Sequence, residues 1–138
     1  MWWNNDMETT YRNMRFKDDV IFTGRVTNDE LHLLLGSATA LVYVSTFEGF
    51  GLPILEAMRS DVPVITSNVT AMPEVAGNAA ILVDPFSVQS ISNGMLQLIE
   101  EEGLIQSLIE RGRQQSQMFS WQKTTDLLWN SILKTLNS

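Results

Sequence analysis

The stretch that decides the fold runs from Ala40 to Met58 and reads A-L-V-Y-V-S-T-F-E-G-F-G-L-P-I-L-E-A-M. Its first five residues, Ala40–Val44, are small, branched or aromatic, and they are typical of a buried strand in a parallel sheet. From Pro53 onward the residues are good helix formers. Proline suits the start of a helix because the N–H that it lacks would have no intrahelical partner there. The stretch therefore predicts a strand, a turn with two glycines and a helix.

The turn has the features of an anion site. The residue ahead of Pro53, where an N-cap is expected, is Leu52, which offers no side-chain acceptor to the free N–H groups of the first helical turn. Gly49 and Gly51 allow the backbone to turn sharply and to approach a ligand closely. Free amides at a helix N-terminus, with the positive end of the helix dipole behind them, bind phosphate. In open α/β sheets such sites lie at the carboxyl ends of the strands, where this turn falls.

Two carboxylates frame the turn: Glu48 in the loop and Glu56 in the predicted first turn of the helix. Phosphate-binding amides beside two carboxylates suit a ligand that carries both phosphates and hydroxyls, such as a nucleotide sugar. A structural alternative has equal weight on spacing alone. Strand–turn–helix units that start with proline occur throughout α/β proteins, and Glu56 could serve only to complement the helix dipole. Neither G-x-G-x-x-G nor G-x-x-x-x-G-K-[ST] is present to decide between the two interpretations.

A family resemblance favours the ligand site. The segment Glu48–Met58 resembles the E-x7-E motif of retaining GT-B glycosyltransferases of family 4, the group 1 glycosyltransferases. The resemblance extends over residues 18–125, with flanking pieces in matching order at Val20–Val26, Val62–Ile65, Pro73–Val75, Val83–Pro85 and Phe119–Trp121. It implies an α/β fold, a Rossmann-like parallel sheet with flanking helices that forms one half of a GT-B fold.

The resemblance also implies a chemistry. A hexosyl group would pass from a nucleoside diphosphate sugar to an acceptor with retention at the anomeric carbon, with no metal and no other cofactor. Glu48 would hold hydroxyls of the donor sugar at the catalytic centre, and Glu56 would accept hydrogen bonds from the ribose. Backbone amides on the sugar and phosphates would come from Gly49, Phe50, Gly51 and Leu52. Such amides stabilise the charge that develops on the leaving diphosphate.

Two further pieces resemble parts of the family's donor cleft. The backbone of Gly24, Arg25 and Val26 would border the nucleotide base, with Arg25 either near a phosphate or simply solvated. Glu74 would lie near the cleft, and a structural role for it is slightly favoured over ligand contact. The family's phosphate-binding arginine and lysine have no obvious substitutes in this sequence.

Composition excludes several other functions. Nine basic and sixteen acidic residues give a net charge of −7, which argues against nucleic acid as a partner. The sequence has no cysteine, and its single histidine, His32, fits a surface or packing position better than a zinc site or a catalytic role. No apolar run reaches about 18 residues and no signal peptide is visible, so we expect a soluble cytoplasmic domain.

Four short apolar runs alternate with helical patterns, which indicates a parallel, doubly wound sheet. The expected strands are Val20–Thr23, Ala40–Val44, Val62–Thr66 and Ala79–Val83. The expected helices cover residues 5–15, 29–36, 53–59 and 73–77, followed by three helices that begin after Ser87, Gly103 and Ser120.

We expect residues 1–138 to be a single nucleotide-sugar-binding domain, the C-terminal half of a glycosyltransferase. Residues 1–17 would be the remnant of a leading helix, and residues 120–138 a helix of the type that crosses back to the partner domain. Trp2 and Trp3 would either pack on the core or, as we favour, show that the chain begins after the first strands. The N-terminal acceptor domain would then be missing, and the chain alone would bind nucleotide sugar weakly and transfer little or none.

Two alternatives remain open at this point. The chain could be a stand-alone nucleotide-sugar-binding module or subunit that acts with a separate acceptor domain, using the apolar face of its last helix as an interface. It could also be a structural α/β domain that has lost its ligand, although the intact glutamate pair argues against this. The resemblance is compatible with peripheral membrane association of the full enzyme. The sugar, the nucleoside, the acceptor and the oligomeric state would depend on loops and on a partner domain.

Overall fold

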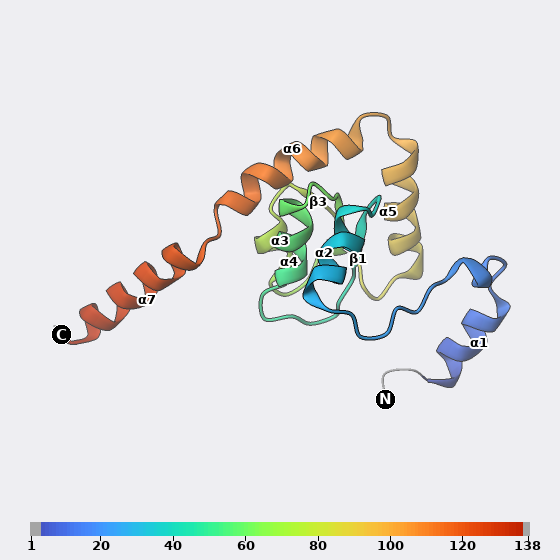
Figure 1. The fold of residues 1–138 in the computed structure, drawn as a ribbon, viewed down its shortest axis with the longest axis horizontal. Coiled ribbons are helices and arrows are strands. Elements are labelled where there is room, and N and C mark those ends of the chain that lie inside the picture. The colour runs from blue at the N-terminus through green and yellow to red at the C-terminus, as the bar shows by residue number, and fades with distance from the viewer. Residues whose placement is uncertain (1–3, 137–138) are drawn as a thin grey trace. The chain divides into compact units, whose positions relative to one another are not determined.

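The computed structural model describes residues 4–136, which divide between Leu31 and His32 into two compact units (Figure 1). Trp2 and Trp3 lie outside the described residues. The elements are α1 (Asn5–Asn13), η1 (Lys17–Asp19), α2 (Asn28–Gly36), β1 (Leu41–Tyr43), α3 (Leu52–Arg59), β2 (Val64–Ser67), α4 (Met72–Ala76), β3 (Ala80–Val83), α5 (Val88–Glu100), α6 (Leu104–Gln117) and α7 (Trp121–Leu136).

The first unit contains the leading helix that the sequence predicts, but it lacks the predicted strand. α1 begins after Asn4, whose side chain accepts a hydrogen bond from the Met7 amide at 2.9 Å. The strand prediction for Val20–Thr23 is wrong, because these residues form no strand. A strand exists only where its backbone groups pair with a neighbouring strand, and the described sheet consists of β1, β2 and β3 alone.

A capping box starts α2. The Glu30 amide donates to Thr27 Oγ1 at 3.3 Å, and the Glu30 carboxylate accepts from the Thr27 amide at 2.7 Å. These bonds from Thr27, first to its amide and then to its hydroxyl, lower the pKa of the Glu30 carboxyl. Thr27 is therefore the N-cap of α2.

The sheet of the second unit has three strands in the order β1-β2-β3, and all of them are parallel. Leu41 pairs with Val64, which in turn pairs with Ala80. The middle strand, β2, is buried along its whole length. Three of the four predicted strands are thus confirmed, and they alternate with helices as expected.

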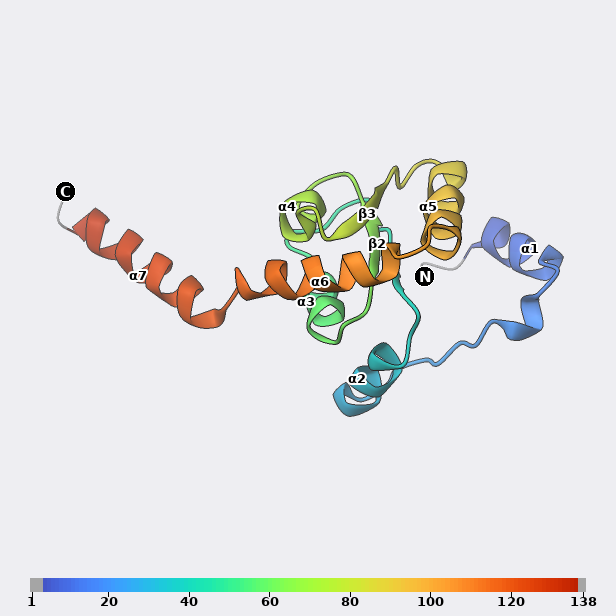
Figure 2. The same cartoon turned by 90° about the horizontal axis from the view of Figure 1, so that it is seen from above.

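Side chains of β2 alternate between two cores, as the pleat of a strand requires. Val64 belongs to one core together with Ile54 of α3 and Met72 of α4. Ile65 belongs to the other core together with Leu98 of α5. Figure 2 shows α5 on the opposite side of the strands from α3 and α4. The sheet is therefore covered on both faces, which is typical of parallel sheets.

The long helix α6 is tied to both α3 and α4. Arg113 forms a two-pronged ion pair with Asp61, just after α3, with N···O distances of 2.6 and 2.7 Å. Gln115 donates to the Val75 carbonyl of α4 at 3.0 Å. These contacts fix α6 against the elements that follow β1 and β2.

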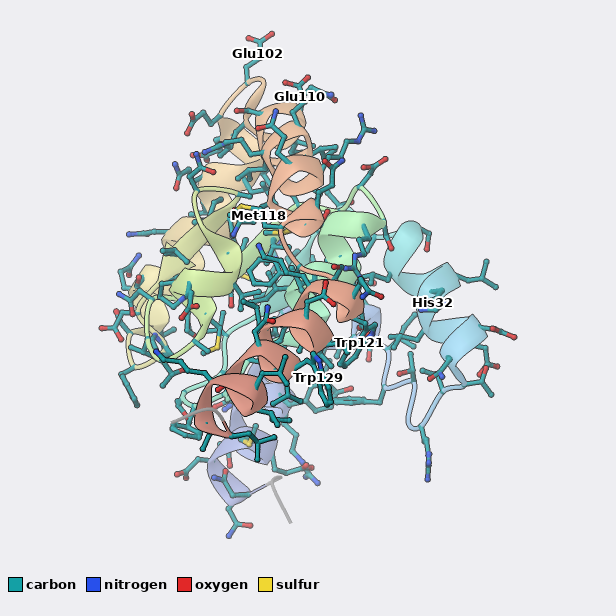
Figure 3. The ribbon with its side chains drawn as sticks, turned by 90° about the vertical axis from the view of Figure 1, so that its left-hand side faces the viewer. His32, Glu102, Glu110, Met118, Trp121 and Trp129 are labelled. Atoms are coloured by element: carbon teal, nitrogen blue, oxygen red, sulfur yellow. The ribbon has the colours of Figure 1, made fainter. Side chains whose placement is uncertain are left out.

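Every residue of α7 is exposed, including its apolar side chains. The helix begins after Ser120, whose hydroxyl accepts from the Lys123 amide at 3.1 Å. Figure 3 shows Trp121 and Trp129 on this helix, and their exposed fractions are 78% and 59%.

One glycine sets the distance between α5 and the sheet. A Cβ added at Gly94 would lie 2.7 Å from Val83 Cγ1 and 3.3 Å from Ile81 Cγ2. Real Cβ atoms do not approach other heavy atoms so closely, so a side chain at this position would push the helix away from β3.

We expect Gly94→Ala to lower the free energy of unfolding by about 1–3 kcal/mol, because the added methyl overpacks the core. Gly36, at the end of α2, has open space around its Cβ position and supplies the matched control. Gly36→Ala should change the stability by less than about 0.5 kcal/mol. Urea unfolding of both variants measures the difference, and equal stabilities would contradict the packing argument.

Candidate functional site

The candidate site is the loop of residues 44–51 between β1 and α3, called the motif turn below. It leaves the carboxyl end of β1, as the sequence predicts. The helix begins at Leu52, so the N-cap is Gly51 rather than Leu52. Gly51 has φ 101° and ψ 49°, a left-handed conformation that favours glycine. No side chain caps the N-terminus of α3. Pro53 has no N–H and the Ile54 amide donates to the Gly51 carbonyl at 3.0 Å, so the free amide of this first turn is that of Leu52.

The earlier helix start also moves Glu56. It is the fifth residue of α3, and the first turn contains no acidic residue, which corrects the sequence expectation. Helix-dipole effects fall off within the first turn, so this position weakens the interpretation that Glu56 only complements the dipole. Glu56 is partly buried, and within residues 4–136 its carboxylate has no hydrogen bond or ion pair. Its carboxylate is available to a ligand.

The loop after β2 lies beside the motif turn. The Glu48 amide donates to Thr70 Oγ1 at 3.4 Å. The buried Ser67 hydroxyl donates to the Ser45 carbonyl at the start of the turn. Carboxyl ends of parallel strands meet at one edge of a sheet, and these bonds join two of the loops at that edge.

Tyr43, the last residue of β1, holds the side chain of Glu48. Its hydroxyl donates to Glu48 Oε1 at 2.6 Å, while its ring packs against the core that contains α3 and α4. The bond to Glu48, followed by burial and by the carboxylate charge, raises the pKa of Tyr43 to about 12. The phenol therefore keeps its proton near neutral pH and stays a donor.

From the sequence, Tyr43 is expected only to be a strand residue. A signal for its role was available: it is a hydroxyl-bearing residue at the carboxyl end of a buried strand, five positions before Glu48. Residues at that end of a parallel strand point toward the site that the loops form. Thr70 was missed for another reason, since its contact joins residues 22 positions apart and needs the sheet to form first.

The ring of Phe50 packs away from the polar groups of the turn. It meets Phe119 edge to face, with ring centroids 5.7 Å apart. Arg59 donates to the Phe119 carbonyl at 2.9 Å and so anchors this segment to α3. A small, mainly apolar pocket of about 120 Å³ lies here, lined by Phe50, Leu52, Leu55, Arg59, Phe119, Ser120, Trp121 and Thr124. Phe50 therefore serves packing, and only its backbone is suited to an anion.

The remaining candidates lie elsewhere in the chain. Gly24, Arg25 and Val26 belong to the first unit, and their position beside the motif turn stays a prediction. Glu74 is exposed on α4. His32 is exposed on α2, as Figure 3 also shows, which agrees with a surface residue.

Among residues 4–136, no group of three or more His, Cys, Asp or Glu side chains is arranged to hold a metal ion. Of the helices in the same range, none combines the length and apolar character needed to cross a membrane.

The parallel sheet, its flanking helices and the turn after β1 define the α/β fold of GT-B glycosyltransferases. The fold matches sucrose-phosphate synthase from Thermosynechococcus elongatus with a TM-score of 0.77 at 24% identity, over 94% of this chain and 34% of that one. It also matches the C-terminal domain of a group 1 glycosyltransferase, LpcC, from Francisella tularensis with a TM-score of 0.71 at 28% identity, over 82% of this chain and 60% of that one. The sequence matches the family "Glycosyl transferases group 1" over residues 3–115, and the chain belongs to this family.

Curated relatives include two kinds of mannosyltransferase. The chain is 43% identical to O-antigen chain mannosyltransferase B of Escherichia coli over 104 residues, which are 75% of this chain and 27% of that protein. It is 36% identical to the serotype-specific mannosyltransferase WbdA of Escherichia coli over 122 residues, 88% of this chain and 15% of that protein. The chain thus spans about a quarter or less of the length of these relatives.

The contact between Tyr43 and Glu48 predicts a late tyrosine titration. The phenolate absorbance of the folded protein should contain a transition at about pH 12 that is lost in Tyr43→Phe. Glu48→Gln should move this transition to lower pH, because the hydrogen bond to an ionised carboxylate and its negative charge, which both oppose ionisation of the phenol, are then removed.

The sign of the stability effect follows from the same shift. The folded-state pKa of Tyr43 lies above its ordinary value of 10.0. The contact with Glu48 therefore contributes fully to the free energy of unfolding below pH 10, and this contribution is lost as the pH rises through 12. Circular dichroism identifies the pH range in which the fold persists. A phenolate absorbance transition that stays at the same pH in Glu48→Gln would contradict the contact between Tyr43 and Glu48.

Proposed function

We propose that this chain is the donor-binding domain of a retaining, metal-independent glycosyltransferase. It would bind a nucleoside diphosphate sugar, from which a hexosyl group passes to an acceptor. The observation that carries this proposal is the motif turn, in which the uncapped N-terminus of α3 opens at the carboxyl end of β1 beside a fixed carboxylate. Membership of the group 1 family supports glycosyl transfer as the reaction.

The backbone of the motif turn binds the diphosphate and part of the sugar. Gly49, Phe50, Gly51 and Leu52 supply the amides, and the positive end of the α3 dipole adds to their attraction for phosphate. The Cβ position of Gly49 has no heavy atom within 4 Å, which leaves room for a ligand to approach the backbone. Fixed amides of this kind stabilise the charge of the leaving diphosphate without reorganising during the reaction.

The two carboxylates bind the hydroxyl groups at the two ends of the donor. Glu48 holds hydroxyls of the sugar at the catalytic centre, and Glu56 accepts from the ribose. An ionised carboxylate is an acceptor only, so both residues select donors such as hydroxyls and repel the phosphates between them. The absence of protein partners for the Glu56 carboxylate within residues 4–136 supports its role as a ligand contact.

The names of the relatives narrow the choice of donor sugar. Because several proteins similar to this chain are named mannosyltransferases, mannose is the first sugar to examine. Gly24, Arg25 and Val26 would contact the base of the same nucleotide.

An acceptor-binding domain would complete the cleft, either in a longer chain or as a separate subunit. The exposed apolar side chains of α7, among them Trp121, Leu128 and Trp129, favour an interface of this kind and keep the module hypothesis open. A cytoplasmic location and peripheral membrane association of the full enzyme remain predictions.

The donor-binding role is tested by an NMR titration of the chain with UDP, GDP and ADP and with their common sugar conjugates. We expect one nucleotide to shift the amide signals of Gly49, Gly51 and Glu56, because the motif turn contacts its phosphates and ribose. Gly49→Ala should weaken this binding about tenfold by placing a methyl group where the ligand approaches.

The matched control is Gly36→Ala, since neither glycine has atoms within 4 Å of its Cβ position and neither change disturbs the packing. This variant should bind the nucleotide as the parent chain does. If millimolar nucleotide and nucleotide sugar left the motif turn unshifted in the parent chain, the donor-binding role would be wrong.

The chain alone should transfer no measurable sugar, because the motif turn supplies only one side of a cleft. The measurement is release of nucleoside diphosphate, with transfer to simple sugar acceptors, in the presence of the nucleotide sugar that binds. Sugar transfer by the isolated chain would refute the need for an acceptor domain, while leaving donor binding intact.

A further inference from the structure

We propose that Tyr43 is a positioning residue that orients Glu48 toward the sugar of the donor. The inference rests on the proposed function and adds a residue to it. Tyr43 does not contact the donor; it acts through the Glu48 carboxylate, and its effect is confined to the sugar end of the ligand.

Glu48 lies in a loop and is held at two points. Its amide donates to Thr70 Oγ1 at 3.4 Å, and its carboxylate oxygen Oε1 accepts from the Tyr43 hydroxyl at 2.6 Å. The second bond is short, as expected where a hydroxyl donates to an ionised acceptor, and such bonds are stronger than neutral ones. The bond to Tyr43 therefore determines where the carboxylate points.

The phenol is itself held by the sheet. Tyr43 pairs with Thr66 across β1 and β2, and the Thr66 hydroxyl donates to the Tyr43 carbonyl at 2.8 Å. Thr66 is fully buried, and the ring of Tyr43 packs on the core. Tyr43 thus transfers the rigidity of the buried strand to a side chain in the loop.

Because of this bond, the two carboxylate oxygens of Glu48 have different roles. Oε1 is engaged by the phenol, which leaves Oε2 to accept from a sugar hydroxyl. Without the phenol, the side chain of Glu48 would regain its rotamers, and the sugar would have to order it on binding. The amides that bind the diphosphate belong to residues 49–52, and their positions do not depend on the Tyr43 hydroxyl. Loss of that hydroxyl should therefore weaken recognition of the sugar and spare that of the nucleotide.

The test compares Tyr43→Phe with the parent chain by NMR titration, using the nucleoside diphosphate that binds and its mannose and glucose conjugates. The affinity for the sugar conjugate should fall about tenfold, and the affinity for the nucleoside diphosphate should stay within about twofold. The matched control is Tyr11→Phe, which removes the other tyrosine hydroxyl, one that donates to the Lys17 carbonyl. It should change neither affinity.

A double variant shows whether Tyr43 acts through Glu48. Glu48→Gln should also lose affinity for the sugar conjugate, and adding Tyr43→Phe to it should cause little further loss, because the two residues serve one contact. Independent losses that multiply would overturn the positioning role. Equal weakening of the nucleotide and of its conjugate in Tyr43→Phe would also overturn it, since that pattern indicates a general disturbance of the turn.

Failure of the proposed function gives a different result. If the parent chain bound no nucleotide and no nucleotide sugar, the donor-binding role and this inference would both fall. If the parent chain bound both and Tyr43→Phe bound them equally well, only the positioning role of Tyr43 would be wrong.

Discussion

The site depends on two buried hydroxyl groups at the end of β2. Thr66 donates to the carbonyl of Tyr43, and Ser67 donates to the carbonyl of Ser45, so the end of β1 is held beyond the last ladder pair. Both hydroxyls are fully buried, where a polar group without a partner would be costly. These bonds fix the point at which the chain leaves the sheet, and the motif turn starts from that point.

Helix packing gives this edge its rigidity. Gly94 brings α5 close to β3, and a Cβ added at Gly112 of α6 would lie only 3.2 Å from Met58 Cγ of α3. Gly94 has no room for a side chain, and a side chain at Gly112 would press on Met58. The motif turn and α3 thus rest on a core in which two glycines outside the turn allow helices to pack closely.

The sequence predicted the features that depend on neighbouring residues and missed those that depend on pairing across the chain. The strand–turn–helix at residues 40–59 has local signals throughout, and its elements are present. Val20–Thr23 has the residue types of a strand, but a strand also needs a ladder partner, which propensity does not supply. The cap at Gly51 follows from a left-handed backbone that glycine permits but does not require. The position of Tyr43 at the carboxyl end of β1 is readable from the sequence, but its bond to Glu48 forms only when the loop folds back beside its own strand.

The two glutamates of the motif have the same chemistry but different surroundings. Glu48 is held by a phenol and by a threonine from the next loop, whereas the carboxylate of Glu56 has no partner within residues 4–136. A held carboxylate imposes a geometry on its ligand, and a free one adapts to it, because the ordering cost is met during folding in the first case and on binding in the second. On the proposed function, the sugar would meet the rigid residue and the ribose the adaptable one. This division suits a transferase, since geometry has to be strict only where a bond is broken.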